Sequence, residues 1–256
     1  LTYSDQTFGN WDCDKVFLLQ TYTCHPSMAI NELSGPLVLT GVAYWLMQQT
    51  NLRKKYHVLY APESIGTITW LSQNEDLRKK IEMGLIITCV GHDGEFNYKQ
   101  PKVNDEQLSR NVSSAFRRED EVLKVKKFTP FGSDERQYNT RGINIPVGSL
   151  MRTPYHEYLE YHTSLDNLDI LSWGAIAETV QKYIEIIKIY DANDTFVMKN
   201  AMCEPFLGKY ENLYYSNDHR TPSEYTKVVK WLIHYCDGSH DLLDIAEMSG
   251  LEIDII

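Results

Sequence analysis

The sequence has 256 residues, of which 43% are hydrophobic and 23% charged, which fits a soluble globular chain with one large domain and a smaller one. A net charge of −10 disfavours nucleic acid and membranes as partners, and five cysteines without repeated spacing argue against a disulfide framework. No leader or membrane-spanning run is visible, so we expect a cytoplasmic location. Because the sequence starts at Leu1 and stops within an apolar run, we expect it to be part of a longer chain.

Short apolar runs alternate with helical patterns through the first 190 residues. The β-prone run 16–23 comes first, and apolar positions spaced by three and four then predict a helix up to about Gln49. Further elements are expected in this order: strand 56–61, helix 65–81, strand 85–90, helix 104–120, strands 122–128 and 143–147, and a helix whose apolar face covers 176–187. This alternation predicts an α/β fold with a mostly parallel sheet sandwiched by helices.

The pattern changes after Tyr190, where residues 191–194 have the composition of a linker. We therefore expect an α/β domain over residues 1–192 and a second domain over 193–256. Thr221-Pro222-Ser223-Glu224 is a helix-start signal. It predicts a helix over 224–235, a second helix over 242–248 and a third segment after Gly250, which is the layout of a small winged-helix-like α domain.

The charge of this second domain bears on its partners. From Lys209 onward it holds four basic and nine acidic residues, a balance of −5. A helix that reads DNA needs the opposite sign. We therefore expect a protein partner, or self-association through this domain, rather than nucleic acid.

Polar side chains follow three of the predicted strands directly. His25, Glu63 and His92 each come just after such a strand, where sites collect in parallel sheets. His162 lies far downstream, in Tyr161-His162-Thr163. Two histidines with nearby carboxylates are the minimum for metal-assisted hydrolysis. Cys24 adjoins His25, but neighbouring residues on a strand face opposite sides, so we expect its thiol to point away.

The ordered motifs resemble the zinc-dependent aminopeptidases with a co-catalytic metal pair. They resemble more closely a bacterial branch of aminopeptidase-like proteins that ends in a winged helix. The motifs are Cys24-His25-Pro26-Ser27, Asn31-Glu32-Leu33-Ser34-Gly35, Glu63-Ser64-Ile65-Gly66, Gly132-Ser133-Asp134-Glu135 and Tyr161-His162-Thr163 with Asp166. The resemblance implies a zinc exopeptidase-like fold, one or two zinc ions, and hydrolysis of a peptide or small amide.

The resemblance also assigns roles to single residues. It matches His25 and His162 to zinc-ligand histidines and Glu63 to the general base. Asn31 stands where the relatives have an aspartate that bridges two metals, and Ser64 replaces a liganding glutamate. The remaining acidic ligand is expected after the third strand, at His92-Asp93.

Asn31 is the departure with the largest chemical consequence. A neutral amide cannot neutralise two Zn²⁺ ions as a bridging carboxylate does. We therefore predict a single zinc ion held by His25, His162 and either Glu32 or Asn31, with Glu63 as base. Each residue also has a structural alternative: a turn for His25 and His92, an aromatic cluster for His162, a helix start for Glu63, and a helix cap for Asn31 and Glu32.

Arg152 and Tyr155 are candidate substrate-binding residues. Arg152 could hold a substrate carboxylate, and a surface ion pair is the alternative. Asp166 and Asp169 could orient the second ring nitrogen of His162 or cap the helix that follows.

Three functions from different classes fit these observations. The preferred one is a metal-dependent exopeptidase or related amidohydrolase. The second is a catalytically impaired peptidase-like scaffold or ligand-binding protein, linked to surface-polysaccharide enzymes, which Asn31 and Ser64 favour. The third is a regulator acting through the winged helix, which the acidic second domain disfavours.

Overall fold

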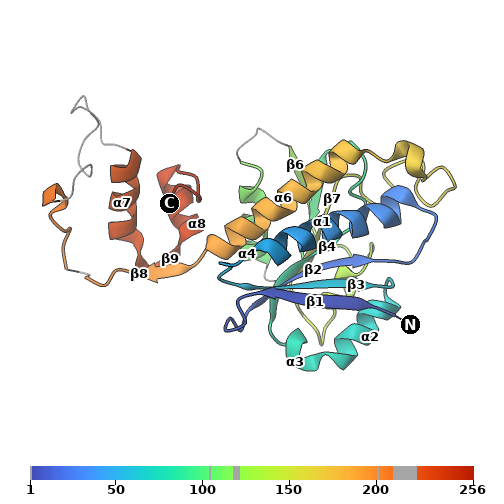
Figure 1. Ribbon diagram of the computed structural model, residues 1–256, viewed down its shortest axis with the longest axis horizontal. Coiled ribbons are helices and arrows are strands. Elements are labelled where there is room, and N and C mark those ends of the chain that lie inside the picture. Colours follow the sequence, from blue (N-terminus) through green and yellow to red (C-terminus); the bar gives the residue numbers. More distant parts are fainter. Residues whose placement is uncertain (1, 104, 118–121, 201, 210–223) are drawn as a thin grey trace. The chain divides into compact units, whose positions relative to one another are not determined.

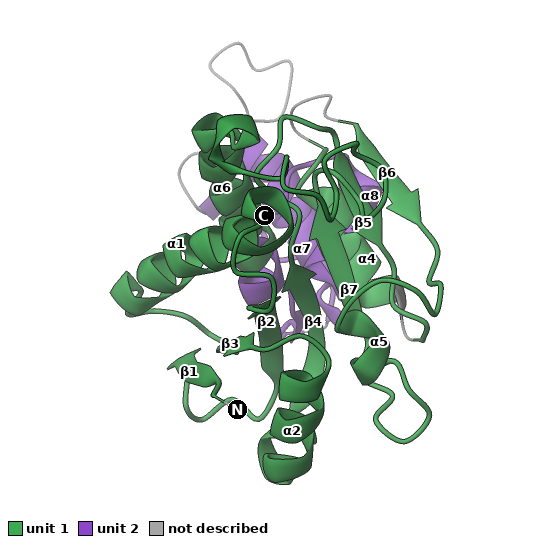
Figure 2. Cartoon of the chain, turned by 90° about the vertical axis from the view of Figure 1, so that its right-hand side faces the viewer, with its two compact units in different colours: residues 1–187 green, residues 188–256 purple. Residues whose placement is uncertain are grey.

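The computed structural model describes residues 2–103, 105–117, 122–200, 202–209 and 224–256. The chain divides into two compact units, residues 1–187 and 188–256, which are shown in Figures 1 and 2 and described separately below. The linker expected at 191–194 begins inside a helix, because α6 (Trp173–Ala192) continues through its first two residues.

Unit 1 is built on a seven-stranded sheet in the order β1-β3-β2-β4-β7-β5-β6. Strands β3, β2, β4 and β7 are parallel neighbours, β1 pairs antiparallel at one edge, and β5 pairs antiparallel to β7. The strands are β1 (Ser4–Gly9), β2 (Val16–Tyr22), β3 (Lys55–Ala61), β4 (Ile81–Ile87), β5 (Phe96–Lys99), β6 (Leu123–Lys126) and β7 (Val147–Met151). The predicted α/β fold with a mostly parallel sheet is confirmed.

Helices cover both faces of this sheet. In Figure 1, α1 (Ser34–Gln48) and α6 lie along one face, and α2 (Ile65–Gln73) and α3 (Glu75–Arg78) lie on the other. Gly41 lets α1 approach α6 closely, since a Cβ built there would be 2.9 Å from Val180 Cγ2. The remaining helices of unit 1 are α4 (Asp105–Ser114), α5 (Glu135–Tyr138), η1 (Ala29–Leu33) and η2 (Leu168–Ile170).

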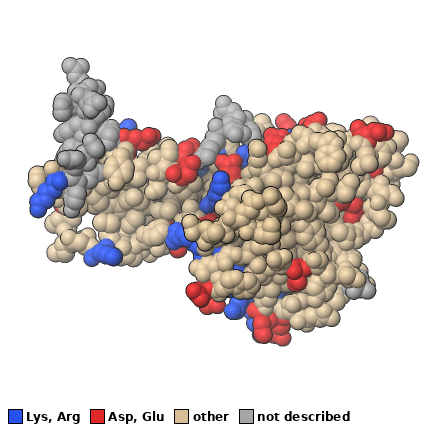
Figure 3. Space-filling model, viewed as in Figure 1, with Lys and Arg blue, Asp and Glu red and all other residues tan. Residues whose placement is uncertain are grey.

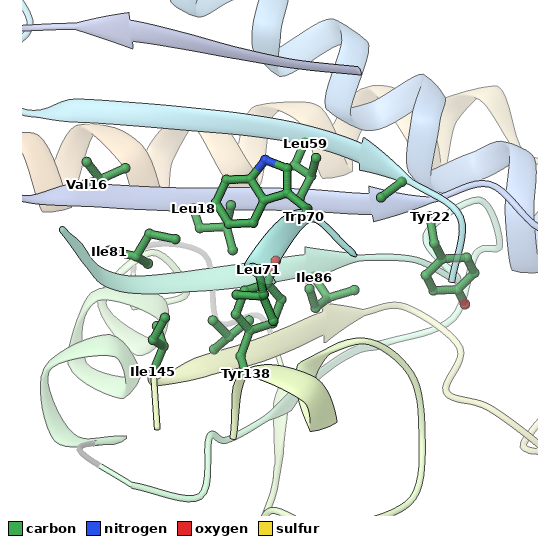
Figure 4. Packing of buried hydrophobic residues seen from close by; sticks show 12 residues of the cluster. Val16, Leu18, Tyr22, Leu59, Trp70, Leu71, Ile81, Ile86, Tyr138 and Ile145 are labelled. Carbon is green, nitrogen blue, oxygen red and sulfur yellow. The ribbon is translucent and has the colours of Figure 1, made fainter. Parts of the chain in front are cut away.

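The apolar run of β2 is a strand because both of its faces are covered. All seven of its residues are buried. Val16, Leu18 and Tyr22 belong to one buried cluster with Trp70, which is drawn in Figure 4. Burying side chains of this size contributes about 1.5–3 kcal/mol each, which fixes the strand register.

The predicted bounds of three elements in unit 1 are wrong. The helix expected over 65–81 ends at Gln73, because Asn74 leaves the helical region and its side-chain amide donates to Trp70 O at 2.9 Å. After the short α3, β4 runs from Ile81 to Ile87, so the strand expected over 85–90 begins and ends earlier than predicted. The strand expected at 143–147 starts only at Val147, because the backbone N–H groups of residues 142–144 all donate to Thr140 O in a turn.

Other differences concern strands without a strong apolar pattern. The sequence did not predict β1 or β5, because β1 is half exposed and β5 has four residues. The helix expected over 104–120 is described as α4, whereas residues 104 and 118–121 lie outside the described residues.

Unit 2 pairs two short strands with two helices. β8 (Thr195–Val197) is antiparallel to β9 (Asp237–Asp241), which separates α7 (Glu224–Tyr235) from α8 (Leu242–Ser249). A short helix, η3 (Leu207–Lys209), completes the described elements. Asp241 and Asp244 form a capping box that starts α8, and Gly250 ends it with φ +70°.

The two predicted helices of unit 2 are confirmed, but the third segment is not helical. Beyond the left-handed Gly250, residues 253–255 form a turn instead. The start signal at 221–223 lies outside the described residues.

Lys and Arg side chains on the face shown in Figure 3 are scattered among Asp and Glu. Within the described ranges, no helix is both long enough and apolar enough to cross a bilayer.

Candidate metal centre

The loop that follows β2 carries Cys24 and His25 side by side. β2 ends at Tyr22, so strand alternation no longer applies to these residues. Cys24 Sγ lies 2.8 Å from His25 Nδ1, and the expectation that the thiol points away is wrong. The coil after the strand turns both side chains to the same side.

Glu32 of η1 holds this loop in place. It is buried, and its Oε2 accepts the Cys24 backbone N–H at 2.8 Å. Its Oε1 lies 2.9 Å from His25 Nδ1. Because a carboxylate only accepts, Nδ1 carries the proton, and Nε2 keeps the lone pair that a metal needs.

His162 is brought next to His25 from the far end of unit 1. The two ring centroids are 4.8 Å apart, and Tyr161 stacks on the His162 ring at 4.0 Å. His162 has a left-handed backbone with φ +56°. Burial lowers the pKa of His162, as do the neighbouring His25 and His156. A neutral imidazole is the form that binds metals.

Asp166 ties the His162 segment to η1. It is fully buried and accepts three backbone N–H groups, from Ala29 at 3.1 Å, Ile30 at 2.6 Å and Asn31 at 3.1 Å, and the hydroxyl of Tyr158 at 2.9 Å. Asp166 therefore caps η1, and the prediction that Asp166 or Asp169 caps the helix that follows is wrong, because η2 is capped by Asn167, whose Oδ1 accepts the Asp169 N–H at 2.8 Å.

Glu63 follows β3 and faces the same loop. Its Oε1 accepts the Ser133 hydroxyl at 2.7 Å, and its Oε2 is 3.5 Å from Cys24 Sγ. Ser64 has a left-handed backbone with φ +58°, and its N–H donates to Asp134 Oδ1 at 2.7 Å. This strained turn directs the Glu63 side chain toward the loop that carries Cys24 and His25. Ser64 itself is bound through its backbone N–H.

Asp134 is a buried acid that the sequence did not single out. Besides Ser64 it receives a hydrogen bond from Gln20 Nε2 at 2.8 Å. Burial raises the pKa of Asp134 to about 7. The motif Gly132-Ser133-Asp134-Glu135 was the available signal, since it supplies both the partner of Glu63 and this support.

Asn31 is buried, and its amide is turned toward Tyr22 and Cys89. Its Nδ2 donates to Tyr22 Oη at 3.2 Å and lies 3.7 Å from Cys89 Sγ. Its Oδ1 is buried without a hydrogen-bond partner. The amide oxygen therefore remains available as an uncharged ligand for a metal ion.

Arg152, Tyr155 and His92 have no described side-chain hydrogen bond to these residues, although Tyr155 lies near enough to Glu63 for that charge to act on its hydroxyl. Arg152 Nη1 pairs with Glu178 at 2.5 Å and its Nε donates to Gly94 O, an arrangement that favours the ion-pair alternative. The Tyr155 hydroxyl is buried without a partner, and burial raises its pKa well above the usual value. His92 is half-buried, and its Nδ1 has no partner.

The donors around His25 fit a single zinc ion. One ligand atom from each of Cys24, His25 and Glu63 lies within 4.8 Å of the other two. Thiolate, imidazole and carboxylate are the ligand types of zinc. Burial, followed by Glu32 and Glu63, raises the pKa of the Cys24 thiol, and a bound cation would reverse this.

Comparison with known proteins gives a consistent fold. Residues 1–193 match the family model described as a domain of unknown function, DUF4910, and residues 194–256 match a winged helix-turn-helix. A Clostridium acetobutylicum protein named for polysaccharide biosynthesis and an aminopeptidase-like domain is 41% identical over 255 residues, which are 98% of this chain and 57% of that protein.

Solved structures agree. The crystal structure of a Clostridium acetobutylicum protein described as a putative peptidase has a TM-score of 0.84 at 38% identity, covering 98% of this chain and 56% of that one. An aminopeptidase from Aneurinibacillus sp. strain AM-1 has a TM-score of 0.60 at 14% identity, covering 74% of this chain and 47% of that one, which shows a shared fold. The chain thus spans little more than half the length of the Clostridium proteins it matches.

Proposed function

Since the chain belongs to the DUF4910 family, joined to a winged helix, we propose that its first unit is a peptidase-like hydrolase that cleaves a peptide or small amide with one zinc ion. The proposal depends mainly on His25 and His162, which are far apart in the sequence of unit 1 but have ring centroids 4.8 Å apart. Glu63 lies beside His25. The aminopeptidase-like name of the Clostridium relative supports the same class of reaction.

His25 and His162 would hold the zinc ion, with Glu32 or Asn31 as the next donor. Glu32 keeps His25 in the tautomer that leaves Nε2 free. When bound, zinc supplies a Lewis acid that polarises an amide carbonyl and lowers the pKa of water to about 7.

Glu63 is the general base of the proposed reaction. Ser133 fixes one of its oxygens at 2.7 Å, which leaves the other facing the histidine loop. That oxygen accepts a proton from the attacking water and delivers it to the leaving amine. Tyr155, with its unpartnered hydroxyl, stays the candidate for contact with substrate, whereas Arg152 is engaged by Glu178 and Gly94.

Metal analysis and hydrolysis assays test this proposal together. Wild-type protein purified without chelator should contain zinc and hydrolyse a leucyl- or alanyl-anilide in the presence of Zn²⁺, Co²⁺ or Mn²⁺. H25A and H162A should lose zinc, and E63Q should keep zinc but lose turnover. If neither histidine variant lowers the zinc content, the site is misassigned.

A second candidate is a peptidase-like scaffold or ligand-binding protein that has lost catalysis. Two observations favour it: the neutral Asn31 amide, and Ser64, which is held through its backbone N–H. The polysaccharide-biosynthesis name of the Clostridium relative suggests its setting. Absence of turnover with every metal, in protein that still binds zinc, would support this candidate.

For the second unit we propose protein docking or self-association rather than DNA reading. Its sequence from Lys209 onward has a balance of −5, which repels phosphate. A gel shift at low salt tests this, and retarded DNA would refute it.

A further inference from the structure

In the proposed set of His25, His162 and either Asn31 or Glu32, the third ligand is either neutral or already engaged in hydrogen bonds. Asn31 is neutral. Both Glu32 oxygens already accept hydrogen bonds, from the backbone N–H of Cys24 and from the ring of His25. Two neutral imidazoles and an amide would leave a divalent cation without a balancing anionic ligand.

Cys24 lies where such a ligand is needed. Its Sγ is 3.5 Å from Oε2 of the proposed base Glu63, and one ligand atom from each of Cys24, His25 and Glu63 lies within 4.8 Å of the other two. A cation in contact with this sulfur is therefore within reach of Glu63.

The contacts of His25 decide which of its ring nitrogens is left for the metal. Cys24 Sγ is 2.8 Å from His25 Nδ1, too close for both atoms to bind one tetrahedral zinc ion. Nδ1 is already committed to Glu32, so Nε2 is the nitrogen left for the metal. Glu32 thus holds both halves of the Cys24-His25 pair without itself having to bind the ion.

We infer that the Cys24 thiolate is a ligand of the metal in this site, together with His25 and His162. This inference rests on the proposed function and deepens it, because it replaces Asn31 or Glu32 as the third ligand. The thiol loses its proton on binding, and the thiolate contributes the negative charge that Asn31 lacks.

Cobalt substitution of the 256-residue chain tests the inference. Wild-type protein loaded with Co²⁺ should show a thiolate-to-cobalt charge-transfer band in the near ultraviolet. C203S is the matched control, because Cys203 is an exposed cysteine of unit 2, and it should keep the band. C24S should lose it, and its zinc affinity should fall by more than the roughly 10–100-fold typical of outer-shell changes.

The outcomes separate this inference from the proposed function. If C24S keeps the charge-transfer band and its zinc affinity stays within about threefold of C203S, while H25A and H162A lose zinc, Cys24 is not a ligand and the histidine site stands. If wild-type protein binds neither zinc nor cobalt, both proposals fail. Circular dichroism of every variant shows whether a loss of metal reflects unfolding.

Discussion

Asp166→Asn should destabilise unit 1 by about 3 kcal/mol. In the wild type, Oδ1 accepts the N–H groups of Ala29 and Ile30, and Oδ2 accepts the N–H of Asn31 and the Tyr158 hydroxyl. An amide nitrogen at the Oδ2 position faces the Asn31 N–H and leaves it without an acceptor, which costs about 1–3 kcal/mol. The remaining two bonds lose charge assistance, about 1 kcal/mol together.

Thermal unfolding measures this loss. A change of about 3 kcal/mol corresponds to a fall in Tm of roughly 6–12 °C for a unit of this size. Asp169→Asn is the matched control three residues away, because that side chain is exposed, and it should stay within about 0.5 kcal/mol of wild type. A Tm for D166N equal to that of D169N would refute the cap.

Three further results follow from the same contacts. Ser133→Ala should leave zinc content unchanged but slow anilide hydrolysis at least about tenfold, because Glu63 loses its 2.7 Å partner; equal rates would contradict the orienting role. Lys99→Met should destabilise the fold by about 3–5 kcal/mol in urea titrations, because it leaves buried Glu135 without its cation at 2.6 Å. Adding Glu135→Gln should recover part of the lost stability. Purely additive effects of the two substitutions would argue against an interaction between Lys99 and Glu135. Burial lowers the pKa of His57 to about 4, below its unfolded value of 6.5, so its contribution to stability is present above about pH 6.5 and is lost as pH falls through 4. His57→Gln should therefore lose less free energy of unfolding over that pH range than the wild type. Parallel profiles of stability against pH for the two proteins would contradict this.

The sequence alone determined the elements that depend on strong, local patterns. β2, β3, α1 and α7 lie within a few residues of their predicted bounds, because continuous apolar runs and helical spacing reflect burial directly. The ordered motifs likewise indicated the family's fold. Edge strands such as β1 were missed, since an exposed strand needs a partner to form and carries little apolar pattern of its own.

Only the tertiary structure decided how the site residues meet. The sequence indicated His25, His162, Glu63 and Glu32 as site residues. It could not show that Glu32 contacts both the Cys24 backbone N–H and the His25 ring, nor that Asp166 caps η1. It misplaced Cys24, because strand alternation ends where backbone pairing ends, and a coil residue points where its long-range contacts direct it. Contacts between residues more than a hundred positions apart, such as those of Asp166 with η1, have no local signature in a single sequence.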